Sequence, residues 1–155
     1  MKLTAVVEAK KGQTKRFEKH QINDKEMELL ADKKPKWLNN YGYIVGTYQE
    51  DGDEVDCFIL GKALNIGKAV EVQPVAMIVF DDDAKVDDKL ICIQKSYNKI
   101  LLGLRLHRLL KYIKKTKPNS KVLAIVKDKQ LIQAKIDRAQ SLYRVLIGGV
   151  NDKKD

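Results

Sequence analysis

The order of predicted elements most limits the fold of this chain: short β-type segments come first, and two segments with helical periodicity follow. The β-type segments are rich in Val, Ile and Tyr, are separated by Gly, Asn or Asp, and cover residues 3–8, 41–47, 55–60, 70–80, 89–94 and 121–126. Pro74 predicts a bend or an edge position within the longest of them. Five or six strands with two later helices predict a mainly β, α+β domain, in which helices pack outside a small closed or partly open barrel.

The two helical segments are identified by apolar residues spaced three and four positions apart. Their apolar positions are Leu106, Leu109, Leu110 and Ile113 in the first, and Ile132, Ile136, Ala139, Tyr143 and Leu146 in the second. We expect the first helix between Arg105 and Lys117, and we expect Gly148 and Gly149 to stop the second. The chain has 155 residues and no internal repeat or linker. We therefore predict one domain over residues 1–150 and a frayed tail over 151–155.

The N-terminus, the apolar runs and the cysteines indicate the compartment of the protein and whether it associates with membranes. Glu8 interrupts the N-terminal apolar residues before a signal-peptide core can form, and no run is long enough to cross a bilayer. Cys57 and Cys92 lie in apolar runs without metal-ligand spacing, so we predict that they are reduced core thiols. These features favour a cytoplasmic protein that does not bind membranes.

Charge is distributed unevenly along the chain. Residues 1–49 carry 10 basic and 6 acidic side chains, residues 50–88 carry 3 and 11, and residues 89–155 carry 17 and 4. The net charge of +9 suggests a nucleic-acid partner, because clustered Lys and Arg neutralise phosphates. The central acidic block opposes this, since it repels a polyanion unless divalent cations neutralise it. A solvated acidic face is the simpler alternative.

The acidic block contains two clusters beside predicted strands. The first, DGDEVD at residues 51–56, directly precedes an apolar strand, and a turn at Gly52 lets Asp51, Asp53 and Asp56 converge as hard oxygen donors. A calcium-binding helix-loop-helix is excluded, because Val55 and Lys62 stand where that motif needs an oxygen donor and Glu. The second cluster, residues 81–88, lies between strands and is followed by Lys89. Either cluster alone is typical of a solvated turn, but together they favour a shared metal and phosphate site.

These residues carry a resemblance to a known family. The segments NYGYI at 40–44, DGDEVD at 51–56 and QPVA at 73–76, followed by Asp82, Asp87 and Lys89, occur in the order and spacing typical of the soluble inorganic pyrophosphatases of the first family. The match is specific over about residues 40–92 and weaker elsewhere. It implies a five-stranded closed β-barrel of the oligonucleotide-binding type and Mg2+-dependent hydrolysis of pyrophosphate to two phosphates, with Mn2+ as a possible substitute.

The resemblance also implies a role for each matching residue. Asp53 would be the catalytic base that orients and deprotonates the attacking water. The metal ligands would be Asp51, Asp56, Asp82, Asp87, Glu18 and Glu8. The contacts to phosphoryl oxygens would come from Arg16, Tyr41, Lys89 and Tyr112. The register within residues 81–83 and 87–88 is open by one position, and family members of this length imply a homo-oligomer, a hexamer in bacterial chains.

Three positions depart from the family pattern. An Arg of the family falls at Leu29 or Leu30, a Tyr falls at Trp37, and a Lys after Tyr112 is replaced by Ile113. Lys33, Lys34, Lys36, Lys111 and Lys114 are close enough in sequence to substitute, although an ammonium does not reproduce a bidentate guanidinium.

The prediction is thus an inorganic diphosphatase that acts on pyrophosphate as a small-molecule substrate. Two alternatives stay open: a basic nucleic-acid-binding barrel that keeps a relic metal site, and a divergent hydrolase of another pyrophosphate-containing substrate. Nucleic acid is a partner only under the first alternative.

Overall fold

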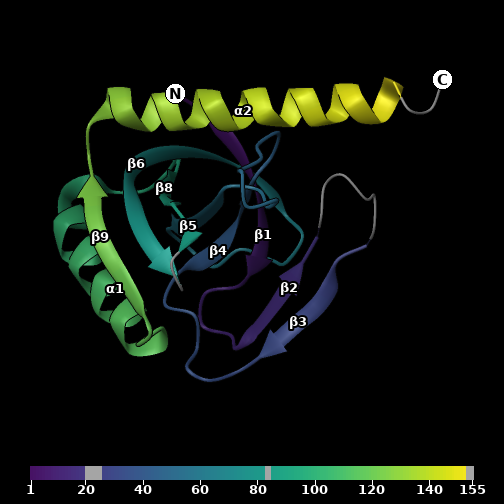
Figure 1. Cartoon of the computed structure of the whole chain (residues 1–155). Coiled ribbons are helices and arrows are strands. Elements are labelled where there is room, and N and C mark those ends of the chain that lie inside the picture. The colour runs from purple at the N-terminus through teal and green to yellow at the C-terminus, as the bar shows by residue number, and fades with distance from the viewer. Residues whose placement is uncertain (20–25, 83–84, 153–155) are drawn as a thin grey trace.

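The structure is a computed structural model, and it describes residues 1–19, 26–82 and 85–152. Figure 1 shows the elements. In chain order they are β1 (Leu3–Ala9), β2 (Lys15–Glu18), β3 (Glu28–Asp32), β4 (Asn40–Ile44), β5 (Asp56–Leu60), β6 (Ala69–Asp82), β7 (Lys85–Val86), β8 (Lys89–Gln94), the 3-10 turn η1 (Lys99–Leu101), α1 (Leu102–Thr116), β9 (Ser120–Val126) and α2 (Lys129–Asp152).

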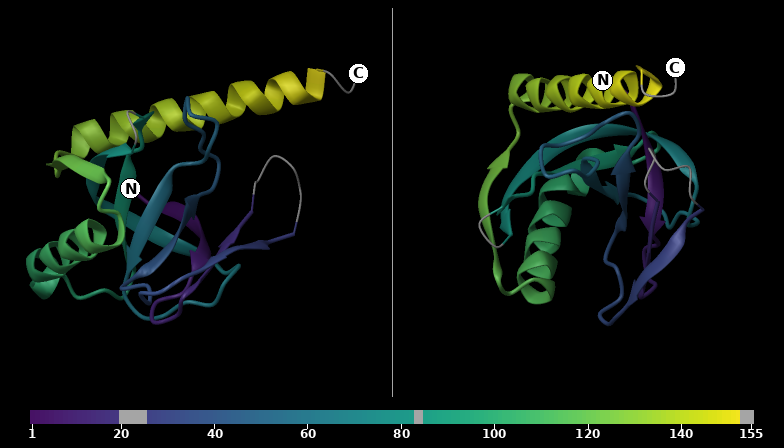
Figure 2. Two further views of the ribbon diagram at one scale, coloured as in Figure 1. Left: turned by 60° about the horizontal axis from the view of Figure 1, so that its bottom comes forward. Right: turned by 45° about the vertical axis from the view of Figure 1, so that its right-hand side comes forward.

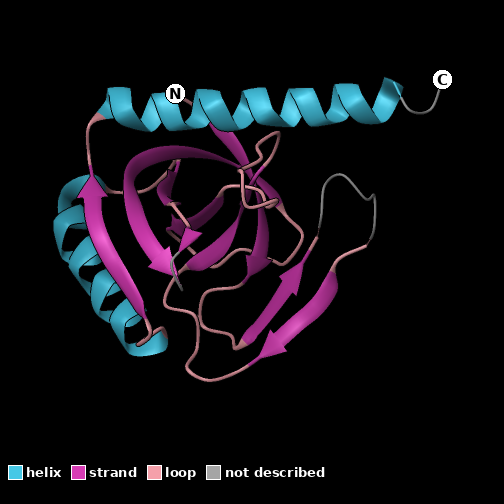
Figure 3. Cartoon of the chain, in the orientation of Figure 1, coloured by secondary structure: helices cyan, strands magenta, loops and turns pink. Residues whose placement is uncertain are grey.

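Five strands close into a barrel in the order β1-β4-β5-β8-β6, because β6 also pairs with β1. All of these pairings are antiparallel except that of β5 with β8. The predicted five-stranded closed barrel with two outer helices is therefore confirmed. The pair β2 and β3 extends the sheet from β1, and Figure 3 shows it projecting from the barrel.

Strand β6 pairs with four other strands along its length, β1, β7, β8 and β9, and Pro74 lies between two of these pairings. One edge of β6 pairs with β1 up to Val72 and with β9 from Met77 onward. The other edge pairs with β8. Pro74 therefore lies where the described pairings leave one edge of β6 unpaired, and the register with β8 shifts between Pro74 and Ala76. The edge position predicted for Pro74 is therefore present, as expected for a residue that cannot donate a ladder hydrogen bond.

Strands β4, β5 and β8 are buried on both faces, and each helix covers a different cluster of buried side chains. One cluster joins Cys57, Ile59 and Leu90 to Ile132 and Ile136 of α2. The other cluster joins the intervening residues of the same strands, including Phe58 and Ile91, to Leu109 and Ile113 of α1. Burial on both faces explains the continuous apolar runs. The expected core thiols are confirmed, since Cys57 and Cys92 are buried and unbridged.

Helix α2 runs through Gly148 and Gly149 to Asp152, so the predicted stop at these glycines is wrong. Neither glycine is among those with a positive φ, the conformation that a C-terminal glycine cap requires. Glycine permits such a cap but does not impose it. Figure 2 shows that the C-terminal part of α2 extends past the barrel. The expected frayed tail is thus helical at residues 151 and 152, and residues 153–155 lie outside the described residues. None of the described helices is both long and apolar enough to cross a membrane.

The backbone of β4 passes close to that of β1 at Gly42. A Cβ at this position would lie 2.0 Å from the backbone oxygen of Val6, and backbone cannot move aside without breaking the pairing. We expect Gly42→Ala to lower the free energy of unfolding by about 3 kcal/mol or more. Gly103 of α1 is the matched control, because nothing lies within 4 Å of its added Cβ. Gly103→Ala should be stabilising by about 0.5–1 kcal/mol through helix propensity. Urea unfolding measures both, and equal midpoints would contradict the expectation.

Candidate functional site

The site is organised around Lys89 at the start of β8. Asp56 and Lys89 are partners in the parallel pairing of β5 with β8, which brings their side chains together. The Lys89 Nζ donates to the hydroxyl of Tyr41 at 2.9 Å and lies 3.3 Å from Asp56 Oδ2 and 2.9 Å from Asp87 Oδ2. The Tyr41 hydroxyl donates to Asp56 Oδ2 at 2.7 Å. Four of the predicted site residues are therefore joined in one polar network.

The ammonium of Lys89 is held charged although it is only 3% exposed. Burial lowers its pKa, but Tyr41, Asp56 and Asp87 outweigh that effect and raise the pKa above its ordinary value. The same network acts on Tyr41, because burial and the nearby Asp56 charge raise the pKa of its hydroxyl. At neutral pH the network therefore holds a fixed positive charge between two carboxylates, with a neutral phenol beside it.

Tyr41 also joins the network to a group of aromatic rings. Its ring stacks on Trp37 with centroids 5.1 Å apart and meets the edge of Phe58 at 5.0 Å. The guanidinium carbon of Arg16 lies 5.0 Å from the centroid of the Tyr41 ring. Arg16 Nε is buried and has no hydrogen-bond partner among the described residues, so it is a donor available to a ligand oxygen. Cation–π contact and burial together orient Arg16.

Glu8 and Glu18 lie on neighbouring strands close to Arg16. Arg16 is opposite Ala9 in the pairing of β1 and β2, and Glu8, Glu18 and Asp56 all interact electrostatically with the guanidinium. Glu8 is 4% exposed, and its Oε2 accepts a hydrogen bond from the backbone N–H of Lys19 at 3.3 Å. Burial, with the negative charge of Asp56 as the next cause, raises the pKa of Glu8 from 4.5 to about 8. Three carboxyl groups, those of Glu8, Glu18 and Asp56, thus surround the Arg16 guanidinium.

This raised pKa predicts that Glu8 lowers the stability of the metal-free protein at high pH. Below pH 4.5 the carboxyl is protonated in both states; between 4.5 and about 8 only the unfolded chain releases the proton, so stability falls as pH rises. We expect Glu8→Gln to be more stable than the parent by about 2–4 kcal/mol at pH 9, and by much less at pH 4.5. Urea unfolding in chelator measures this difference. Glu71→Gln, at an exposed position of β6, should show no such pH dependence.

Asp51 and Asp53 lie on the exposed turn before β5. The turn is closed by hydrogen bonds from Gln49 N to Asp53 O at 2.7 Å and from Gly52 N to Gln49 O at 3.1 Å, and Gly52 has a φ of +92°. Asp51 Oδ1 accepts from the backbone N–H of Asp53 at 3.1 Å. Within the described ranges, no group of three or more Asp, Glu, His or Cys side chains is arranged to hold a metal ion. The predicted convergence of Asp51, Asp53 and Asp56 therefore stays a prediction.

The second acidic cluster divides between two faces. Asp87 contacts Lys89, and its backbone N–H donates to Phe80 O at 2.9 Å, whereas Asp88 is buried on the other side and pairs with Lys135 of α2 at 3.2 Å. The structure thus places Asp87, and not Asp88, beside Asp56. The side chain of Asp82 lies outside the described residues.

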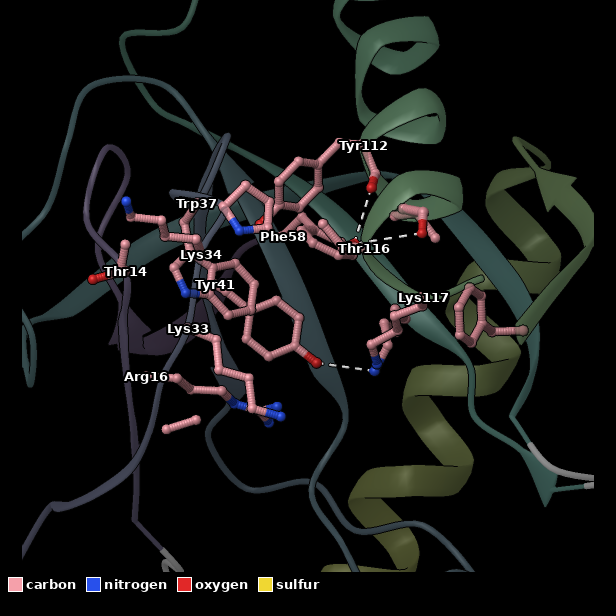
Figure 4. Close-up of a pocket in the computed structure, with 15 residues that line it drawn as sticks. Thr14, Arg16, Lys33, Lys34, Trp37, Tyr41, Phe58, Tyr112, Thr116 and Lys117 are labelled. Atoms are coloured by element: carbon pink, nitrogen blue, oxygen red, sulfur yellow. Dashed lines mark hydrogen bonds between the residues drawn. The ribbon is translucent and has the colours of Figure 1, made fainter. Parts of the chain in front are cut away.

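A cavity of about 250 Å³ adjoins this network, and Figure 4 shows the residues that line it. Two kinds of side chain meet there: the cations Arg16, Lys33, Lys34, Lys89 and Lys117, and the rings of Trp37, Tyr41, Phe58, Phe80 and Tyr112. In the figure, Arg16, Lys33 and Lys34 lie across the cavity from Thr116 and Lys117. Arg16, Tyr41, Lys89 and Tyr112, which were predicted to contact phosphate, all line it.

The positions predicted for missing phosphate donors have different surroundings. Leu29 and Leu30 lie on β3, are 55% and 51% exposed and do not line the cavity. The cavity is lined instead by Lys33 and Lys34 just after β3, and by Lys117, four positions after Ile113. Of the other predicted substitutes, Lys36, Lys111 and Lys114 are not among the lining residues. Helical spacing from Ile113 is the sequence signal that could have identified Lys117.

The carboxylates fit divalent magnesium in their chemistry. Glu8, Asp56 and Asp87 offer the hard oxygen donors that Mg2+ prefers, and the pKa of Glu8 is raised chiefly by burial and secondly by repulsion from the charge of Asp56. A divalent cation would relieve that repulsion. The predicted ligands Asp51, Glu18 and Asp82 stay predictions.

Comparison with known proteins identifies the family. The model of the inorganic pyrophosphatase family matches residues 5–105, which is more than half of the chain. An inorganic pyrophosphatase of Halobacterium salinarum is 32% identical over 91 residues, covering 57% of this chain and 51% of that protein. One from Haemophilus influenzae is 40% identical over 55 residues, covering 35% and 31%. The chain thus matches about half or less of the length of these curated relatives.

Solved structures show the same fold. A protein of Anaplasma phagocytophilum described as an inorganic phosphatase superposes with a TM-score of 0.77 and 18% identity, covering 92% of this chain and 94% of that chain. The inorganic pyrophosphatase of Thermus thermophilus superposes with a TM-score of 0.73 and 20% identity, covering 92% and 91%. Because the family model spans the strands that carry Arg16, Tyr41, Asp56 and Lys89, this chain belongs to the inorganic pyrophosphatase family.

Proposed function

We propose that the protein hydrolyses inorganic pyrophosphate to two phosphates. The observation that carries this proposal is the juxtaposition of a carboxylate group and a cation-lined cavity, joined at Lys89. Pyrophosphate is a polyanion whose two ends need different surroundings. One end needs metal ions that activate water, and the other needs fixed donors for the charge of the leaving phosphate.

The acidic side would hold Mg2+, with Mn2+ as a substitute, through Asp51, Asp56, Asp82, Asp87, Glu18 and Glu8. Bound Mg2+ would neutralise the charges of the carboxylates and the phosphates, and it would lower the pKa of water. Asp53 would accept the proton of the attacking water. Its exposed position on the turn before β5 gives that proton a path to solvent.

The cationic side would bind the leaving phosphate. Lys89 and Arg16 would donate to its oxygens, and the buried Nε of Arg16 has no competing partner among the described residues. Tyr41 fixes Lys89 through a hydrogen bond of 2.9 Å, which orients the ammonium before substrate arrives. Tyr112 lines the same cavity and would contact a phosphoryl oxygen. Donors held in place before the reaction stabilise developing charge without reorganisation.

Phosphate release from pyrophosphate by purified protein tests this function. We expect release with Mg2+ to fall to less than a tenth in chelator, because the carboxylates then repel the substrate. Ca2+ should inhibit, since it is larger and tolerates looser geometry. A rate in chelator equal to that with Mg2+ would refute the metal assignment, and no release under any condition would refute the activity.

Nucleic-acid binding is a second candidate, favoured by the charge of one segment of the chain. The stretch from Lys95 to Lys127, which includes α1 and β9, has ten Lys or Arg and no Asp or Glu. Titration with a labelled single-stranded RNA at rising NaCl tests it. Binding with a steep salt dependence, together with no phosphate release, would favour this function.

We propose a homo-oligomer, a hexamer by resemblance, which sedimentation measures directly. We also propose a cytoplasmic location, which the unbridged state of the buried Cys57 and Cys92 supports.

A further inference from the structure

The wall of the cavity is more apolar than a bare phosphate ion requires. Two phosphates expose only oxygen to their surroundings, so each wall that contacts them should offer donors or cations. Here Trp37, Phe58, Phe80, Pro35 and Ile113 line the same cavity as the cations. Ile113 is 4% exposed and packs within the cluster under α1, so it is a fixed part of this wall.

Trp37 is the apolar residue best placed to contact a ligand. Its ring is half-buried and lines the cavity. Its backbone is fixed at both polar groups, since Trp37 N donates to Gln13 O and Gly12 N donates to Trp37 O, each at 2.8 Å. Rings on two elements support its position: Tyr41 at 5.1 Å and Tyr112 at 6.4 Å between centroids. A held aromatic ring of this kind is a platform for stacking.

The charged residues of the cavity surround this platform. Lys33 and Lys34 lie in the same loop as Trp37, between β3 and β4, and both line the cavity. Arg16 and Lys89 lie deeper, where each contacts the ring of Tyr41. A ligand that fits this order of groups has phosphates at the Arg16 and Lys89 end and a flat, largely apolar group beside Trp37.

We propose that the cavity accepts diphosphates that carry a planar aromatic group, such as a nucleoside 5′-diphosphate, with that group stacked on Trp37. This inference rests on the proposed function, because it uses the same carboxylates and the same leaving-group site. It identifies the substituted phosphate as the leaving group, since the cationic cavity and Trp37 lie on one side of the network.

The chemical step is the hydrolysis of one anhydride bond. The oxygen of water forms a bond to the terminal phosphorus, and the bond between that phosphorus and the bridging oxygen breaks. The electron pair stays on the bridging oxygen, which leaves as part of the phosphate monoester. The proton of water passes to Asp53 and then to solvent. For ADP the products are AMP and inorganic phosphate.

A binding experiment separates stacking from turnover. Trp37 is the only tryptophan of the chain, so intrinsic fluorescence reports on this position alone. The probes are adenosine 5′-(α,β-methylene)diphosphate and methylenediphosphonate, which share an uncleavable diphosphate and differ in the adenosine. With Mg2+ present, we expect saturable quenching by the adenosine compound and none by methylenediphosphonate. In calorimetry the adenosine compound should bind about 5- to 100-fold more tightly, the range of one base stacked on an aromatic ring.

Variants at Trp37 give the control. Trp37→Leu should abolish the affinity difference between the two probes, and Trp37→Phe should keep most of it. Circular dichroism checks that both variants are folded. Phosphate release from ADP should also fall relative to release from pyrophosphate in Trp37→Leu. Equal affinity for the two probes in the parent protein, or tight adenosine binding without ADP cleavage, would overturn the inference.

The outcomes distinguish this inference from the proposed function. If the protein cleaves pyrophosphate but binds the two probes with equal affinity, only the proposal of an aromatic diphosphate substrate is overturned. If the protein cleaves ADP but not pyrophosphate, only the proposal that inorganic pyrophosphate is the substrate is overturned. Cleavage of neither compound overturns both.

Discussion

Replacement of Asp53 by Asn is expected to lower kcat for pyrophosphate hydrolysis by about 10²- to 10⁴-fold, the range for the loss of a general base. The amide keeps the shape of the side chain and one oxygen but cannot accept the proton of water. Asp53 lies on the exposed turn before β5, so the substitution should change the free energy of unfolding by less than about 0.5 kcal/mol. Steady-state kinetics at saturating Mg2+ measure kcat, and calorimetry measures the affinity for Mg2+.

Glu50→Gln is the matched control for this prediction. Glu50 lies on the same turn, is exposed and pairs with Arg138 of α2, away from Lys89. Its loss should leave kcat within about twofold, because a surface ion pair contributes little. If Asp53→Asn instead weakens Mg2+ binding and retains a normal kcat at saturating metal, then Asp53 is a metal ligand and the base is another group.

Replacement of Lys89 by Met is expected to lower kcat by about 10²- to 10³-fold, the range for the loss of one donor that stabilises transition-state charge. It should also lower the free energy of unfolding of the metal-free protein by about 3 kcal/mol, because Asp56 and Asp87 lose a buried cation. Met keeps most of the stem volume, so packing changes little. Both carboxylates are only about one fifth exposed, and water therefore replaces the ammonium poorly.

Added Mg2+ distinguishes the two effects of this substitution. Cations bound at Asp56 and Asp87 should restore much of the lost stability, whereas kcat should stay low because the donor to phosphate is absent. Lys2→Met is the control: Lys2 pairs with Glu71 at 3.5 Å with side chains 72% and 52% exposed, so neither stability nor kcat should change. A normal kcat in Lys89→Met would show that Lys89 serves only to neutralise the carboxylates.

Local pattern was sufficient for the barrel strands and for the positions of both helices. The strands from Leu3, Asp56 and Lys89 are apolar runs, and burial on both faces of the sheet makes such runs necessary. The pair β2 and β3 was missed, because KRFE and ELLAD are short, charged and at best half-buried. These strands exist through hydrogen bonds to each other and to β1, and no apolar periodicity within them indicates that pairing.

The sequence by itself determined the order of the strands and helices and the residue types of the site, because both follow from the spacing of residue types along the chain. Only the tertiary structure decided which carboxylate faces Lys89, since Asp87 and Asp88 are chemically identical neighbours and the strand register directs them to opposite faces. It also decided that Lys33, Lys34 and Lys117 line the cavity while Leu29 and Leu30 do not. The physical reason is the same in each case: side-chain direction and distance depend on pairings between segments far apart in sequence, which fix the register of every residue at once.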